Sequence, residues 1–261
     1  MIPLDLTKNK LELFSTRLSV PEFLIFKPKH KTLDFLPTLN LDGKRIYPSQ
    51  SVKYLGVYLD ENLCWKPHVN HIASKLQRAN GALSKIRHYV PHYTLLNIYH
   101  SIFSSHMRYA CQVWGLRDTT TTHRILTLQK SALRLISFNQ PRAPSSPIFA
   151  NLDILNFFDL VKVLNIQFVH KFLNSELPSD TLNTLAFNKI SHYHSTRSNF
   201  LGLLIEPLCQ SKTFGCYSFR RLAILQWNSL QRLHPNINLS EAKPQQLKSI
   251  ATKHYLNSYL D

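Results

Sequence analysis

The sequence lacks the long apolar run that a membrane-spanning helix requires. Such a helix needs roughly 20 consecutive apolar residues, and no segment of the 261-residue chain approaches that length. A basic N-terminal end followed by an apolar run, which would mark a secretory signal, is also missing. We therefore expect an intracellular protein that does not cross a membrane, and the sequence leaves nucleus and cytoplasm equally open.

Cysteine is scarce, and its spacing excludes the common metal knuckles. The four cysteines are Cys64, Cys111, Cys209 and Cys216, and even the last two stand too far apart for a CxxC pair. The 13 histidines are scattered along the chain without ligand spacing. We predict buried reduced thiols, hydrogen-bonded or solvated histidines, and no cofactor for the chain as it stands.

Acidic residues are also few. The sequence has 15 Asp and Glu against 31 Lys and Arg, which gives a formal net charge of +16 and a pI near 9.8. So basic a chain is attracted to polyanions, because each phosphate that it neutralises releases a condensed counterion. Nucleic acid is therefore the favoured partner, ahead of an anionic membrane surface.

The positive charge is concentrated in one stretch of the chain. Between Cys64 and Gln140 the only carboxylate is Asp118. Helical regions normally mix both signs, so few cations in this stretch can have internal counter-ions. The cations are Lys66, Lys75, Arg78, Lys85, Arg87, Arg108, Arg117, Arg124, Lys130 and Arg134.

The same stretch begins with a predicted amphipathic helix. Apolar residues spaced alternately by four and three run from Trp65 to Val90, with Pro67 suited to the first turn and Pro91 to the end. A second stripe, about 110° away at 100° per residue, holds His71, Lys75, Arg78 and Lys85. The stripe is either an ordinary solvated surface or a phosphate contact, and the near absence of acid favours the contact.

The first sixty residues predict short strands. Leu11–Phe14 and Phe23–Phe26 are short apolar runs, and Asp42-Gly43 is a dipeptide typical of tight hairpin turns. Val52–Leu59 predicts a further strand, in which Gly56 marks either a bulge or a close approach of another backbone.

Helical periodicity dominates the rest of the chain. We predict a second helix capped by Thr94 and ending near Met107, and a third that starts at 119–122 and buries Ile125, Leu128, Ala132 and Leu135.

Asn139–Pro147 has three prolines and predicts a linker or exposed loop. Beyond it, Phe157–Leu173 is apolar nearly all round and predicts a central buried helix. Two further helical segments end at Leu230 and follow Ser240. The fold class is mainly α with a small N-terminal β-hairpin portion.

Three groups of motifs resemble LINE-type (non-LTR) retrotransposon reverse transcriptases of the Jockey kind. The first group is Leu41–Ile46 with Ser51–Asp60 (SVKYLGVYLD) and Leu63–His68; the second is Ile98–Ile102 with Met107–Ala110 and Val113–Gly115 (VWG); the third is Leu128–Ile136 (LQKSALRLI). They follow one another in order and at family-like spacing. The tail resembles the family at Ser195–Arg197, Lys212–Gly215 and Trp227–Leu230.

The resemblance implies roles for particular residues. Lys53, Tyr54, Leu55 and Gly56 match the primer grip, the hairpin that holds the primer 3′ end, and Gly56 would let the sugar-phosphate approach closely. The helices that follow resemble the thumb, which would contact phosphates with little base readout. The nucleic-acid contacts expected there are His71, Lys75, Arg78, Lys85, Lys130 and Arg134.

The sequence departs from the family at the catalytic centre. Two-metal phosphoryl transfer needs clustered carboxylates, and the family's aromatic-x-Asp-Asp turn is missing because the chain has no Asp-Asp pair. We therefore expect a fragment without polymerase activity of its own, without catalytic or metal-binding residues, and with Mg²⁺ needed only in the complete enzyme.

This interpretation divides the chain into four parts. Residues 1–62 would be a palm remnant with the primer-grip β segment, 63–138 a basic helical thumb, 139–148 a Pro-rich linker or loop, and 149–261 a helical C-terminal domain. The expected partners are RNA–DNA hybrid or other nucleic acid without sequence preference, no membrane, and the missing palm and fingers region if a longer protein is translated.

Two alternatives remain open. The fragment could serve as a helical protein-interaction module, if removal of the palm leaves Trp114, Phe157 and Phe158 exposed. It could also be an incomplete gene model of an active enzyme.

Overall fold

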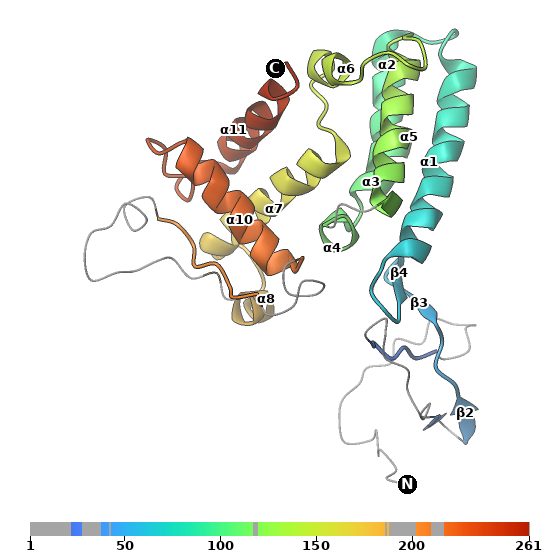
Figure 1. Ribbon diagram of the computed structural model, residues 1–261, viewed down its shortest axis with the longest axis vertical. Coiled ribbons are helices and arrows are strands. Elements are labelled where there is room, and N and C mark those ends of the chain that lie inside the picture. The colour runs from blue at the N-terminus through green and yellow to red at the C-terminus, as the bar shows by residue number, and fades with distance from the viewer. Residues whose placement is uncertain are drawn as a thin grey trace. The chain divides into compact units, whose positions relative to one another are not determined.

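The computed structural model describes residues 22–27, 38–41, 43–116, 120–185, 187, 202–209 and 217–260. It divides into two compact units, Met1–Pro67 and His68–Asp261. The first contains two antiparallel hairpins and the second is helical (Figure 1), which confirms the predicted fold class. None of the helices in the described part is both long and apolar enough to cross a bilayer.

The first unit is built on two short hairpins. Strand β1 (Leu39–Leu41) pairs with β2 (Lys44–Ile46), and Gly43 lies between them with φ +78°, which confirms the tight turn predicted at Asp42-Gly43. The predicted strand Leu11–Phe14 lies outside the described residues. Phe23–Phe26 forms only an isolated bridge from Phe23 to Pro48 rather than a strand.

The predicted strand Val52–Leu59 is in fact a second hairpin. Strand β3 (Ser51–Tyr54) turns at Leu55-Gly56 into β4 (Val57–Asp60), with Tyr54 paired to Val57. Leu55 and Gly56 both have positive φ, 45° and 81°, as a two-residue type I′ turn requires. Gly56 is thus a turn residue rather than a bulge. The prediction failed because leucine gives no signal for a left-handed turn position.

The second unit starts within helix α1 (Lys66–Ile86). Its buried face carries the predicted apolar stripe at Val69, Ile72, Leu76, Ala79 and Leu83, although the helix ends four residues before Val90. Helix α5 (Thr120–Ile136) lies beside α1 (Figure 1), and the side-chain amide of Asn80 donates to the Leu128 carbonyl at 3.0 Å.

The second predicted helix is interrupted. It consists of α2 (His92–Ile98), the π-helical η1 (Tyr99–Ser104) and α3 (Ser105–Arg108). It begins at His92, so Thr94 is not its cap. Its fully buried residues are spaced by four, at Leu95, Tyr99, Phe103 and Met107. The wider π turn keeps this spacing on one face.

Packing between α4 and the central helix sets the position of one glycine. Helix α4 (Cys111–Trp114) ends at Gly115, and Trp114 stacks on Phe157 with ring centroids 5.2 Å apart. A Cβ on Gly115 would lie 2.7 Å from the Phe157 ring and 2.7 Å from the Cys111 carbonyl. Only glycine therefore allows this approach.

The predicted buried helix is α7 (Phe157–Leu173), with the bounds expected from its sequence. It packs against α4, α5, α10 (Phe219–Leu233) and α11 (Pro244–Asn257), and Figure 1 shows α10 crossing it. Two short helices, α6 (Ser146–Asn151) and α8 (Ser179–Thr184), complete the described part.

The third predicted helix buries Ile125 and Ala132 as expected, but its buried face is turned toward Gln129. Gln129 is fully buried in α5, where its amide donates to the Tyr99 hydroxyl at 3.1 Å and to the Leu155 carbonyl at 2.9 Å. Leu128 and Leu135 are only half-buried. Hydrogen bonds made by Gln129 therefore join elements on both sides of residues 139–148, and the four-part domain division stays a prediction.

The cysteines differ from expectation in two places. Cys111 is buried and free as predicted, whereas Cys64 is free but exposed. Cys209 is disulfide-bonded, so the prediction of a reduced thiol was wrong there.

Candidate nucleic-acid interface

The four residues that match the primer grip lie together at the tip of the β3–β4 hairpin. The side chains of Tyr54 and Leu55 are 59% and 73% exposed, and Lys53 and Gly56 are exposed as well. The Lys53 ammonium lies 5.8 Å from the centroid of the Tyr58 ring, its partner across the hairpin. The tip therefore presents an aromatic ring, an apolar side chain and one cation.

Asp60 fixes the chain at the base of this hairpin. Its side chain is nearly buried and accepts hydrogen bonds from the backbone N–H groups of Cys64 at 2.9 Å and Trp65 at 2.8 Å. Both Leu63 and Trp65 have positive φ, so the connection is a tight turn held by one carboxylate. From the sequence, Asp60 was predicted only to end a strand, so this role was not expected.

The predicted cation stripe of α1 borders its buried face and extends from there to exposed positions. His71 and Lys75 are half-buried, while Arg78 and Lys85 are exposed. The four positions lie within an arc of about 80° at 100° per residue. The Arg78 Nε donates to the Ser74 carbonyl at 3.4 Å, which directs the side chain along the helix surface.

The structure adds His106 to this stripe. His106 is half-buried on α3, and its pKa is lowered first by burial and then by the positive charges of Lys75 and Arg78. The pKa of the buried His68 is lowered to about 4, mainly by burial and further by His71 and Lys75. Burial is the larger cause of both shifts, and the cations of the stripe add to it in the same direction. Spacing along the chain could not reveal His106, because a tertiary contact brings α3 to α1.

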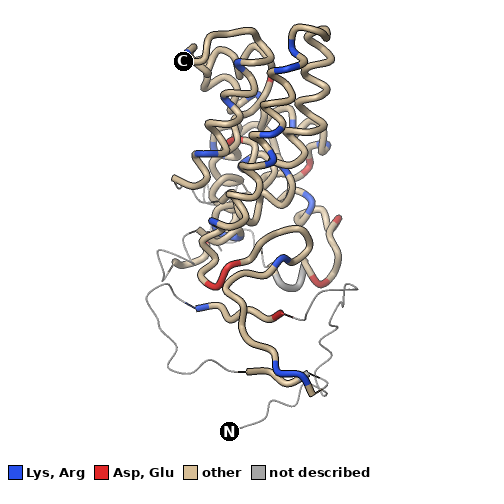
Figure 2. The backbone as a smooth tube through the Cα atoms, turned by 90° about the vertical axis from the view of Figure 1, so that its right-hand side faces the viewer, with Lys and Arg blue, Asp and Glu red and all other residues tan. Residues whose placement is uncertain are grey.

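Few carboxylates are available to neutralise this surface. From Cys64 to Leu152 the described residues include no Asp or Glu. Within the described part of the chain, Lys75, Arg78 and Lys85 form no ion pair; the salt bridges found there are Lys27–Glu61 and Lys162–Asp159. Figure 2 shows Lys and Arg recurring along the helices with few Asp or Glu among them.

The two α5 cations stand apart from the stripe. Lys130 and Arg134 are both half-buried, and the Arg134 Nε donates to the Ala143 carbonyl at 2.9 Å. Arg134 lines a pocket together with Arg87, which the sequence did not single out. Of the predicted nucleic-acid residues, four therefore lie on α1 and Arg134 lines the pocket, whereas Lys130 does not line it.

The apolar surface suggested for a protein-interaction module is not exposed. Trp114 and Phe157 are 1% and 0% exposed because they stack on each other. Phe158 is half-buried and lies edge-on to His123 at 5.3 Å. The expectation of a bare surface at these three residues was wrong, since the second unit packs its own helices over them.

Metal ligands do not gather in the described residues. No group of three or more His, Cys, Asp or Glu side chains there could hold a metal ion. The tail motifs at Ser195–Arg197 and Lys212–Gly215 lie outside the described residues.

The chain is similar to RNA-directed DNA polymerases of mobile elements, which confirms the resemblance to LINE-type, non-LTR reverse transcriptases. One relative is the probable RNA-directed DNA polymerase from transposon X-element of Drosophila melanogaster, 29% identical over 127 residues, 47% of this chain and 14% of that protein. Another is the RNA-directed DNA polymerase from mobile element jockey, 31% identical over 104 residues in Drosophila melanogaster and 29% over 105 residues in Drosophila funebris. Each jockey match covers 39% of this chain and 11% of the relative.

The chain therefore spans a small part of the length of these relatives, as expected of a reverse transcriptase fragment. No protein-family model matches it, and no solved structure matches it significantly.

Proposed function

We propose that this fragment binds RNA–DNA hybrid, or other nucleic acid, without sequence preference through the α1 face. This face is formed by His71, Lys75, Arg78 and Lys85 of α1, together with His106 of α3. In a complete enzyme this face would belong to the thumb, and Lys53–Gly56 would hold the primer end. Phosphate contacts position a duplex without reading its sequence, as a polymerase requires.

One observation carries the proposal. Lys75, Arg78 and Lys85 lie within one arc of α1 and form no ion pair within the described part of the chain, which has no carboxylate from Cys64 to Leu152. Like charges held together without counter-ions destabilise a fold unless a polyanion neutralises them. A sugar-phosphate backbone supplies negative charges at regular spacing along such a face.

Filter binding with an RNA–DNA hybrid at several salt concentrations tests this function. The logarithm of the affinity should fall linearly with the logarithm of the salt concentration, by about one unit for each phosphate contacted. Two hybrids of unrelated sequence should give the same line. An affinity indifferent to salt would contradict phosphate contacts, and a strong preference for one sequence would contradict the thumb role.

We further propose that the chain alone has no polymerase activity. The absence of an Asp-Asp pair from the sequence supports this, because two-metal phosphoryl transfer needs clustered carboxylates to hold Mg²⁺. Primer extension on an RNA template with Mg²⁺ and all four nucleotides is expected to give no product. Incorporation by the purified chain would refute this part of the proposal.

A second possibility is that the chain is an incomplete gene model of an active enzyme. The matches cover only 11–14% of the length of the relatives, which supports this possibility. The genomic DNA immediately upstream decides the matter: an in-frame aromatic-x-Asp-Asp run supports a longer enzyme, and in-frame stop codons contradict it.

A further inference from the structure

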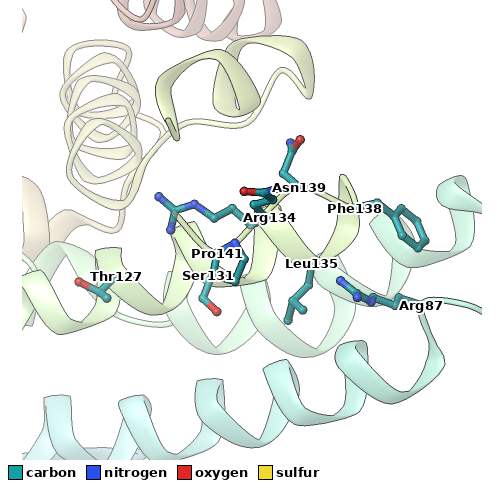
Figure 3. Close-up of a pocket in the computed structure, with 9 residues that line it drawn as sticks. Arg87, Thr127, Ser131, Arg134, Leu135, Phe138, Asn139 and Pro141 are labelled. Carbon is teal, nitrogen blue, oxygen red and sulfur yellow. The ribbon is translucent and has the colours of Figure 1, made fainter. Parts of the chain in front are cut away.

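A pocket of about 610 Å³ opens at the C-terminal end of α5. Its walls come from α5, from the residues just after it and from Arg87, which follows α1. Figure 3 shows the lining side chains spread along the end of α5, with Arg87 and Phe138 at one end, Thr127 and the Arg134 guanidinium toward the other, and Ser131 between them. Its volume falls in the range of about 300–1,000 Å³ that is usual for small-ligand sites.

The chemistry of the pocket walls suits a phosphorylated ligand. Arg87, Arg134 and Ser131 line the pocket together with Thr127, whose hydroxyl donates to the His123 carbonyl at 3.0 Å, and none of the described residues that line it is acidic. The Arg134 Nε is held by the Ala143 carbonyl at 2.9 Å, and the Arg87 Nε donates to a ring nitrogen of His88 at 3.0 Å. One N–H of each arginine is therefore used to fix its position, and the remaining N–H groups can bind phosphate oxygens.

Phe138 occupies a strained position at the pocket rim. The bonds from the Phe138 N–H to the Leu135 carbonyl and from the Asn139 N–H to the Arg134 carbonyl end α5 in a Schellman motif. Phe138 takes the left-handed position of this motif with φ +55°, where glycine is the usual residue. Its side chain is nevertheless 52% exposed, so core packing does not explain the phenylalanine.

The Phe138 ring is held in place by basic neighbours. The Arg87 guanidinium lies 5.5 Å from its centroid, and His88 meets it edge-on at 5.5 Å. An exposed aromatic ring fixed beside arginines is the usual combination in sites for single-stranded nucleic acid, because every base can stack on it. A duplex cannot use the ring in this way, since its bases are already stacked.

We propose that this pocket binds an unpaired nucleotide of a single strand, with the base stacked on Phe138 and the adjoining phosphates held by Arg87 and Arg134. The site differs from the α1 face in its ligand, an unpaired strand rather than a duplex. The two guanidinium groups lie toward opposite ends of the lining (Figure 3), which favours successive phosphates of a strand over a single free phosphate.

Phe138→Gly in the full chain is the decisive variant, because it removes the ring and relieves the left-handed strain. Binding would be measured by fluorescence anisotropy with an oligothymidine strand, an abasic strand of equal length and a blunt-ended RNA–DNA hybrid. The variant should bind oligothymidine on the order of ten-fold more weakly, the size of effect expected from one stacked base. The abasic strand and the hybrid should change less than about two-fold, since neither stacks a base here.

Thermal unfolding of the same variant separates binding from folding. Its midpoint should stay level or rise, because glycine is favoured at this φ. Unchanged oligothymidine binding would overturn the proposal, and so would equal losses for oligothymidine and the abasic strand. A drop in midpoint with parallel loss for all three probes would assign Phe138 a structural role and would also overturn it.

Two matched controls complete the test. Phe26→Ala removes a phenylalanine of similar exposure, 56%, and should leave all three affinities unchanged. Arg87→Gln should lower the salt slope for oligothymidine by about one unit, whereas Arg232→Gln on α10 should not. Variants of the α1 face should reduce the salt dependence of hybrid binding and leave that of oligothymidine binding unchanged. The duplex function and the pocket can therefore be refuted independently of each other.

Discussion

Acidification is expected to destabilise the helical unit through one buried histidine. His68 is fully buried at the start of α1, where its ring meets Trp114 edge-on with centroids 5.3 Å apart. Its pKa is lowered from 6.5 to about 4 by burial and by the positive charges of His71 and Lys75. The unfolded chain therefore binds a proton more readily than the folded chain at every pH between these two values.

The size and sign of the effect follow from proton linkage. The stability that neutral His68 supports is fully present above pH 6.5 and is lost as the pH falls toward 4. A depression of this size corresponds to about 3 kcal/mol of unfolding free energy at the acid end of the window. His100, His106 and His254 also have lowered pKa values, so they add to the total in the same direction.

Urea unfolding between pH 7.5 and pH 4 would measure how much of the acid-induced loss of unfolding free energy comes from His68. His68→Phe keeps an aromatic ring against Trp114 and removes the titration, so its unfolding free energy should fall less steeply with acid than that of the wild type. Any hydrogen bond lost with the imidazole shifts the curve without changing its slope. The matched control is His92→Gln at an exposed position, which should retain the wild-type slope. Parallel curves for the wild type and His68→Phe would refute the reasoning.

Three further substitutions test the packing by chemical denaturation. Gln129→Ala should cost about 2–4 kcal/mol, because it leaves the buried Leu155 carbonyl unsatisfied and opens a cavity; a cost below 1 kcal/mol would contradict the buried amide. Gly115→Ala should cost about 1–3 kcal/mol, since its Cβ would lie 2.7 Å from the Phe157 ring, whereas Gly81→Ala, with open space around it, should be neutral or stabilising. Tyr259→Phe should cost about 1–2 kcal/mol by removing the 2.6 Å bond from its hydroxyl to the Asp159 carboxylate, and an unchanged midpoint would show that the segment after α11 is not held to α7 there.

The parts of the fold that the sequence predicted are those where one local signal dominates. Phe157–Leu173 is apolar nearly all round and became the central helix with the expected bounds. The apolar stripe of α1 was predicted because regular helical spacing over 21 residues cannot be mistaken for the two-residue period of a strand. The turn after Leu41 was found because glycine at a hairpin position signals positive φ.

The failures have physical causes of a different kind. Leu55 occupies a left-handed turn position that its side chain disfavours, so β3 and β4 looked like one strand. Gln129 resembles a surface residue until Tyr99 and Leu155 supply its partners. His106 and Arg87 join their sites through packing between helices, which no spacing along the chain encodes.

The most direct test of the central claim compares salt slopes for RNA–DNA hybrid binding between two double variants. Lys75→Gln with Arg78→Gln removes two charges from the α1 face, and Lys248→Gln with Lys253→Gln removes two exposed charges from α11. If phosphates lie along α1, the first pair should lower the slope by about two units and the second should leave it unchanged. Equal slopes for the wild type and the α1 pair, or equal losses from both pairs, would contradict a nucleic-acid interface on α1.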